Sequence, residues 1–250
     1  MLVLSVAVAV VTTSPGWPRV RQTFFSWQHA EDSFPTIARG FWLNVKLFLL
    51  AEPLILVVGV LVAVARGTTA AALFPIRAIA VIYTDLFRGV PTILVVFLVC
   101  FGVPALQLQG VTNDLFSLAL VALVLSYGAY VAEVFRAGIE SIHPSQLASA
   151  TSLGLSPAKT MRFVVLPQAV RRVVPPLLND FVSLQKDTAL VASVGLVEAL
   201  RSAQVYSSFN FNFTPYLVAA AFFVALTVPM ARFTDWMGRR VARREQGGGR

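Results

Sequence analysis

Long apolar runs alternate with shorter polar segments along the chain. A helix needs about 20 mainly apolar residues to cross the hydrocarbon core of a bilayer. The runs lack the two-residue alternation that a transmembrane β-barrel requires. The pattern therefore predicts an all-α, polytopic membrane protein, a bundle of five core transmembrane helices, which are Phe41–Ala65, Ala78–Leu108, Ser117–Ala132, Val173–Leu196 and Pro215–Ala231.

Some segments fit this pattern less well. The run Leu2–Val11 is short for a span, and is either an extra N-terminal helix, a signal-type segment or the end of a longer helix. Residues 15–39 and 197–214 are polar and mixed, which predicts loops. In the second run the clear membrane core is Val90–Leu106, and a bend is expected at Gly89–Pro91.

Composition supports the membrane class. Hydrophobic residues make up 57% of the chain and charged residues 13%, whereas a soluble domain carries about a quarter charged residues. The net charge of +8 comes from arginines that flank the apolar runs, so no nucleic-acid partner is expected. The single cysteine, Cys100, and the isolated His29 and His143 predict neither a disulfide nor a metal site.

Lysine and arginine positions predict the orientation in the membrane. Thirteen of the 20 lie in residues 66–77, in residues 133–172 and from Arg232 onward, while four lie in the opposite set of loops. Positive residues favour the cytoplasmic side. The C-terminus and the polar segment Glu133–Arg172 are therefore expected in the cytoplasm.

The polar segment contains QLASATSLGLSPAKTMRFVVLPQ, residues Gln146–Gln168. Ser145 is the expected N-cap of a short helix that ends at Gly154. Ser156 and Pro157 predict the start of a second helix, and the pair Leu166-Pro167 predicts its end. Two short helices that meet at a glycine favour a docking surface for a partner over a solvated loop.

This spacing resembles the EAA loop of bacterial ABC importer permeases, in which E-A-A, three residues, glycine, nine residues, isoleucine, one residue and Leu-Pro follow one another. Here the triplet is Ala148-Ser149-Ala150, the glycine is Gly154, Val164 replaces isoleucine, and the pair is Leu166-Pro167. The segments YTDLFRGVP, YGAYVAEVFRAGIESI and VVLPQAVRRVVPPLLNDFVSLQKDTAL are similar to the polar amino acid branch, of the histidine/glutamine/glutamate type.

The resemblance implies a type I importer permease whose cytoplasmic coupling helix is gripped by separate ATPase subunits. It further implies a second permease chain, identical or paralogous, and an extracytoplasmic amino-acid-binding protein. The ATPase-docking residues would be Ala148, Ser149, Ala150, Gly154, Leu155, Leu166 and Pro167. Because the chain has no G-x-x-x-x-G-K-[ST] motif, ATP is expected on the partner, and no cofactor is expected here.

The chain departs from the family where Ala148 stands in place of the usual glutamate. With Ser145 as N-cap, Ala148 would be the third helical residue, where a glutamate closes a capping box. This helix is therefore expected to lack that reciprocal hydrogen bond. Docking is still expected, because the glycine and the spacing remain.

Ionisable residues inside membrane spans usually face a cavity or a partner. The candidate substrate pathway comprises Asn179, Asp180, Ser183, Lys186, Asp187, Thr188 and Glu52. One interpretation is a structural network in which Lys186 neutralises Asp180 and Asp187. The other is a polar pocket that offers an acceptor to the ammonium of an amino acid and a donor to its carboxylate. For Glu52 alone, pairing with a neighbouring helix is the first interpretation.

Together these observations divide the chain into an N-terminal segment and loop (residues 1–39), a transmembrane domain (residues 40–235, with the EAA-like loop at about 143–168) and a basic cytoplasmic tail (residues 236–250). The predicted function is import of a polar amino acid across the bacterial cytoplasmic membrane by alternating access, driven by a separate ATPase. An ion-coupled secondary transporter is the alternative, although no internal repeat is visible. No catalytic set appears, so an enzyme is not expected.

Overall fold

The computed structural model describes residues 5, 9–68 and 70–247, and every regular element among them is helical. Most of the predicted run Leu2–Val11 lies outside these residues. The helices α2 (Trp17–Phe24) and α3 (Trp27–Gly67) occupy the segment before the first predicted span. The prediction of a loop over residues 15–39 is therefore largely wrong.

The physical reason for this early start is packing. Ser26 caps α3, and its hydroxyl accepts a hydrogen bond from the amide of His29 (3.5 Å). Ile37 is fully buried, and Gly40 lies so close to α10 (Ala199–Asn210) that a Cβ there would be 2.6 Å from the carbonyl carbon of Glu198. Tertiary contact thus extends the helix through a segment whose polarity suggests a loop.

The second predicted span is broken. After a short 3₁₀ turn, η1 (Ala71–Leu73), α4 (Phe74–Gly89) and α5 (Thr92–Ala105) meet at an angle of 108°. Val90 between them is extended (φ −99°, ψ 129°), the conformation that the following Pro91 favours. The bend expected at this point is confirmed.

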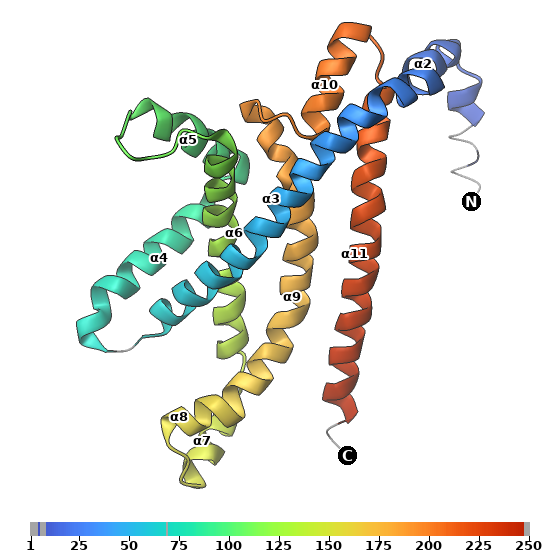
Figure 1. The fold of residues 1–250 in the computed structure, drawn as a ribbon. Coiled ribbons are helices and arrows are strands. Elements are labelled where there is room, and N and C mark those ends of the chain that lie inside the picture. Colours follow the sequence, from blue (N-terminus) through green and yellow to red (C-terminus); the bar gives the residue numbers. More distant parts are fainter. Residues whose placement is uncertain (1–4, 6–8, 69, 248–250) are drawn as a thin grey trace.

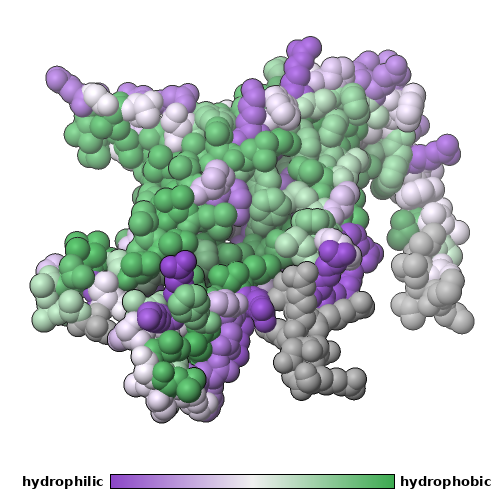
Figure 2. Space-filling view, turned by 60° about the horizontal axis from the view of Figure 1, so that its bottom comes forward, coloured by the Kyte–Doolittle hydropathy of each residue, from purple (hydrophilic) through white to green (hydrophobic). Residues whose placement is uncertain are grey.

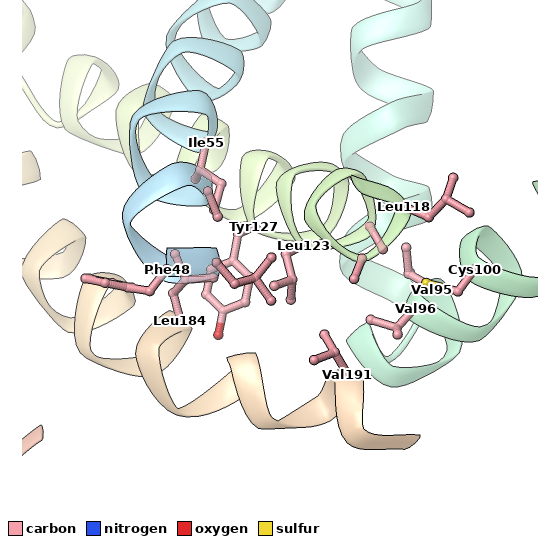
Figure 3. Close-up of a cluster of buried hydrophobic side chains, with 14 of the residues drawn as sticks. Phe48, Ile55, Val95, Val96, Cys100, Leu118, Leu123, Tyr127, Leu184 and Val191 are labelled. Atoms are coloured by element: carbon pink, nitrogen blue, oxygen red, sulfur yellow. The ribbon is translucent and has the colours of Figure 1, made fainter. Parts of the chain in front are cut away.

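Helix α6 (Leu115–Glu140) lies at the centre of the bundle and packs most extensively on α3. Asp114 caps it by accepting from the amide of Ser117 (2.8 Å), and hydrogen bonds from Ser117 lower the pKa of this carboxyl group. Figure 3 shows the main apolar core, in which Leu123 and Tyr127 of α6 meet side chains of α3, α5 and α9.

The second half of the chain begins with the short helices α7 (Pro144–Ser152) and α8 (Pro157–Thr160). A π-helical turn, η2 (Met161–Val165), leads into α9 (Leu166–Asp187), which the 3₁₀ segment η3 (Thr188–Val194) extends. The helix α10 replaces the loop predicted for residues 197–214. Helix α11 (Thr214–Gly247) includes the last predicted span and continues through most of the basic tail.

Three described stretches are long and apolar enough to cross a membrane: α2–α3 together, α6, and α11 as far as Arg240. The bent pair α4–α5 is a fourth candidate. The fourth predicted span, Val173–Leu196, corresponds to α9 and η3. Helix α9 carries Arg171, Arg172, Asp180, Lys186 and Asp187, and it packs against α3, α6 and α11. The all-α membrane bundle is thus confirmed, with one broken span and one polar helix.

The ends of the bundle differ in what they carry. In Figure 1 the connector after α3, the α7–α8 loop and the C-terminal end of α11 lie at the same end, while α2, α10 and the α5–α6 connection lie at the other. Figure 2 shows hydrophobic surface across the middle of the molecule and hydrophilic residues gathered toward its ends.

Candidate docking loop and transport pathway

The loop between α6 and α9 forms a corner at Gly154. Its φ of +75° is a left-handed conformation that glycine adopts without steric cost. The amide of Leu155 donates to the carbonyl of Ala150 (3.1 Å), which is the hydrogen bond of a helix-ending Schellman motif. The predicted helix end at Gly154 and the start at Ser156, whose hydroxyl accepts from the amide of Lys159 (3.4 Å), are both confirmed.

The start of the first loop helix differs from the prediction. Its N-cap is His143, whose Nδ1 accepts from the amide of Ser145 (3.2 Å), and Pro144 is its first residue. Ser145 is therefore inside the helix, and Ala148 is not the third helical residue. The expectation that Ala148 deprives this helix of a capping box is wrong, because the third helical residue is Gln146. Its side chain, not that of residue 148, stands where it could reach back to the N-cap.

The pair Leu166-Pro167 does not end the second helix. The backbone remains helical from α8 through η2 into α9. Pro167 lies in the first turn of α9 and has no amide hydrogen to donate. It is tolerated there because the preceding π-helical turn already changes the backbone hydrogen-bond pattern. The second loop helix and η2 are consequently a continuous helical extension of α9.

The two sides of the loop are joined at its base. The Gln168 side-chain amide donates to the side-chain oxygen of Gln146, and an Arg172 guanidinium N–H donates to the carbonyl of Ser141. Gly138 of α6 lies against α9 so closely that a Cβ would be 2.1 Å from Cγ2 of Val173. These contacts fix the position of the loop relative to α6 and α9.

The exposed surface of the loop is apolar and positively charged. Among the predicted docking residues Ala148, Ser149, Gly154, Leu166 and Pro167 are exposed, Leu155 is half-buried and Ala150 is buried. Two large exposed side chains were not among the predicted docking residues. Leu153, which precedes Gly154 in the chain, is 81% exposed, and Phe163, which follows it, is 63% exposed.

Charge on this surface has one sign. The sequence contains no acidic residue between Ser141 and Asn179, whereas Lys159, Arg162, Arg171 and Arg172 are exposed there. Large exposed apolar side chains rimmed by charge are typical of a protein–protein contact. Spacing in the sequence could not predict that Leu153 and Phe163 are exposed, because large apolar residues usually lie in a core.

A hub of ion pairs lies where α3, α4 and α6 end near the same side. Glu133 accepts hydrogen bonds from Arg66 of α3 (2.8 Å) and from Arg136 of its own helix, and Arg88 of α4 lies 3.7 Å away. Arg66 also donates to the hydroxyl of Thr84 (2.9 Å). The Glu133 carboxylate therefore ties three helices together.

The candidate pathway residues separate into three groups. Asp180 and Asp187 of α9 face α3 and α6: Tyr127 donates to Oδ2 of Asp187 (2.8 Å), and Asp180 lies close enough to Glu52 of α3 for the two carboxylates to interact. Oδ2 of Asp180 is buried without a hydrogen-bond partner among the described residues. In Figure 3 the Tyr127 hydroxyl is turned toward α9.

The second group lies on a different face of α9. Asn179 and Lys186 are exposed and Ser183 is half-buried. Lys186 takes part in none of the ion pairs between described residues. The interpretation of Lys186 as the neutralising partner of Asp180 and Asp187 is therefore not what the structure shows. Pairing of Glu52 with a cation is likewise absent from the described residues, and its charged neighbour is an acid.

Thr188 belongs to a third, structural group. Asn44 of α3 donates to the Thr188 hydroxyl (3.2 Å), which donates to the carbonyl of Gln185 (2.7 Å). The Gln185 side chain accepts from Thr227 of α11 (2.6 Å), and Asn44 also accepts from the amide of Ala199 (3.2 Å). This network joins α3, α9, α10 and α11, and Thr188 is fully buried within it rather than lining a path.

Comparisons with known proteins agree with this geometry. Residues 55–243 match the family described as "Binding-protein-dependent transport system inner membrane component". The chain is 32% identical to the arginine transport system permease protein ArtQ of Bacillus subtilis over 84% of its length and 92% of the relative's. It is 31% identical to the probable glutamine ABC transporter permease protein GlnM of the same organism, over 84% and 95% of the two chains.

Solved structures give the same result. A chain from the crystal structure of an amino acid ABC transporter with histidines superposes with a TM-score of 0.75 at 29% identity, over 82% of this chain and 94% of that one. An inward-facing MetNI methionine ABC transporter superposes with a TM-score of 0.64 at 20% identity, over 82% and 95%. The second likeness concerns the fold alone.

Proposed function

This chain belongs to the family of binding-protein-dependent transport system inner membrane components, as a permease subunit of an amino acid ABC importer and not itself an enzyme, and from this membership we propose how it is driven. An ATPase subunit grips the Gln146–Gln168 loop, and two permease chains alternate between inward-open and outward-open states. A binding protein delivers a polar amino acid at the opposite end. ATP is hydrolysed by the partner alone.

The single observation that supports this docking is the loop itself. It projects at one end of the bundle, presents Leu153 and Phe163, and is held rigidly by the Gln146–Gln168 contact and by η2. A rigid, apolar projection can transmit the movement of a partner to α9, whereas a solvated loop could not. The described parts of the basic segments, residues 66–68, 70–77, 133–172 and 232–247, share this end, which supports a cytoplasmic location for it and for the C-terminus.

The three carboxylates of α3 and α9 support a substrate path along these helices. Glu52, Asp180 and Asp187 offer acceptors for the ammonium of an amino acid at membrane depth. Because these acids lack a cationic partner among the described residues, a cationic amino acid, such as the arginine in the name of the ArtQ relative, suits the path best. Asn179, Ser183 and Lys186 would line it only if the second permease chain faced them.

The docking proposal is tested with the permease, its ATPase subunits and its binding protein in proteoliposomes. Uptake of labelled arginine, lysine, glutamine and glutamate is measured with and without ATP, and ATPase retention is measured by co-purification. Leu153→Asp should abolish both ATPase retention and uptake, whereas the matched change Leu108→Asp, in the loop at the other end, should leave retention unchanged. Uptake that persists without ATP and follows an ion gradient would instead favour a secondary transporter.

The substrate path is tested in the same system with Asp180→Asn. This variant should lose uptake of arginine and lysine while it keeps ATPase retention, and the matched change Asp85→Asn, at an exposed acid of α4 outside the path, should transport normally. Equal uptake by both variants would refute the assignment of these three carboxylates to the path.

A further inference from the structure

Three neighbouring hollows, which share lining residues, lie along α2, the start of α3 and the start of α11. The upper part, about 500 Å³, is lined by Trp17, Arg21 and Phe25 of the α2 region. A middle part of about 330 Å³ shares Phe25 with the upper part, and it shares Trp27 and Ala221 with a lower groove of about 710 Å³. The three parts therefore form one surface that is polar above and apolar below.

The lining of the upper part includes one cation, Arg21, and two aromatic side chains, Trp17 and Phe25. Trp17, Arg21 and Phe25 are four residues apart and so share one side of the helical turn, and the two rings lie 6.3 Å apart between centroids. The Arg21 side chain forms no ion pair with any described residue. Arginine and tryptophan at the end of membrane helices are typical of the bilayer interface.

The lower groove has the opposite chemistry. Its walls are mainly apolar side chains of α3 and α11, among them Phe34 (53% exposed), Val218 and Ala225. The one charged residue in its lining is Glu31, one helical turn after Trp27. Such a groove suits an alkyl chain, whose transfer from water is favoured by roughly 0.8 kcal/mol per methylene group.

The upper part is held in place above the groove. The backbone amide of Phe213 donates to the carbonyl of Thr23 (2.7 Å), the Asn212 side chain donates to the carbonyl of Gln22 (3.0 Å), and the amide of Ser26 donates to the Thr214 hydroxyl (3.0 Å). These hydrogen bonds fasten α2 to the turn that begins α11. Figure 1 shows α2 at the end of the bundle opposite to the α7–α8 loop.

We propose that this surface binds one glycerophospholipid, with its phosphate against Arg21 and one acyl chain in the groove between α3 and α11. The two parts match the two chemistries of such a lipid in the correct order along the membrane normal. A guanidinium can donate two hydrogen bonds to a phosphate, and Trp17 and Phe25 cover the glycerol region. A protein partner would have to match both the isolated cation and the long apolar groove.

The headgroup contact is tested by native mass spectrometry of the full-length protein in mild detergent, titrated with phosphatidylglycerol or phosphatidylethanolamine. Arg21→Gln should weaken retention of both lipids about tenfold, the effect expected for loss of a charge-assisted hydrogen bond of roughly 1.4 kcal/mol. The matched control is Arg19→Gln, which removes the same charge from the other side of α2 and should retain lipid like the wild type. Equal retention by the two variants would overturn the proposal.

The acyl contact is tested with Ala221→Trp, which fills the groove, and with Ala220→Trp, which adds the same side chain on the exposed neighbouring position outside it. Only the first variant should lose lipid. If it retains lipid but turns a permease dimer into a monomer, the surface belongs to a second copy of the chain and the proposal is wrong. Because no ATPase is present in this assay, its failure leaves the docking proposal untouched.

Discussion

Replacing Gly154 with valine separates the conformation of the docking loop from its chemistry. Gly154 has a φ of +75°, and a Cβ there would meet no atom within 4 Å, so the substitution adds backbone strain without a collision. A left-handed residue other than glycine costs roughly 1–2 kcal/mol, and a β-branched one is a clear outlier. This lowers the ratio of loops with the correct corner to loops without it by a factor of roughly 5–30.

Because apparent affinity falls with the fraction of the competent state, the dissociation constant for the ATPase should rise, by up to this factor of roughly 5–30. The measurement is a titration of the permease in nanodiscs with the purified ATPase. The control is Gly110→Val, at φ +80° with no atom within 4 Å, in the connection between α5 and α6 at the other end. Unchanged affinity for Gly154→Val, or an equal loss in the control, would refute the reasoning.

Two further predictions concern stability in detergent. Glu133→Gln should lower the free energy of unfolding by about 1.5–3 kcal/mol, because three arginines lose a shared carboxylate, whereas Glu140→Gln, whose side chain is 61% exposed, should change it by less than about 1 kcal/mol. Gly40→Ala should cost about 1–3 kcal/mol by forcing α3 away from the Glu198 backbone, while Gly67→Ala, with no atom within 4 Å, should be nearly neutral. Thermal unfolding followed by circular dichroism measures the stability of all four variants. If a control variant loses as much stability as the variant with which it is matched, the explanation for that pair is wrong.

Hydropathy predicted the spans in α3, α6 and α11 because each of these helices contains enough apolar residues to cross a bilayer without help from neighbours. It failed for the first half of α3 and for α10, whose polar residues are helical because buried contacts such as those of Ile37 and Ala203 hold them. Turn chemistry located Gly154 and Ser156 correctly. The same rules misplaced the stop at Pro167, since a π-helical turn before it removes the usual conflict.

The candidate site shows a similar division. The sequence singled out Asp180 and Asp187 as candidate pathway residues, and in the structure both face α3 and α6. Spacing within one helix carries no information about neighbours, so the approach of Asp180 to Glu52 and the hydrogen bond from Tyr127 could not be foreseen. For the same reason, the exposure of Lys186 became apparent only once α9 was placed against α3 and α6.

Helix α3 has 41 residues, which corresponds to a length of about 60 Å. It is twice as long as the hydrocarbon core is thick, and it touches the Glu133 hub at one end and α10 and α11 at the other. One continuous helix therefore connects the two ends of the bundle. A tilt of α3 about its contact with α6 would displace Arg66 and Trp27 in opposite directions.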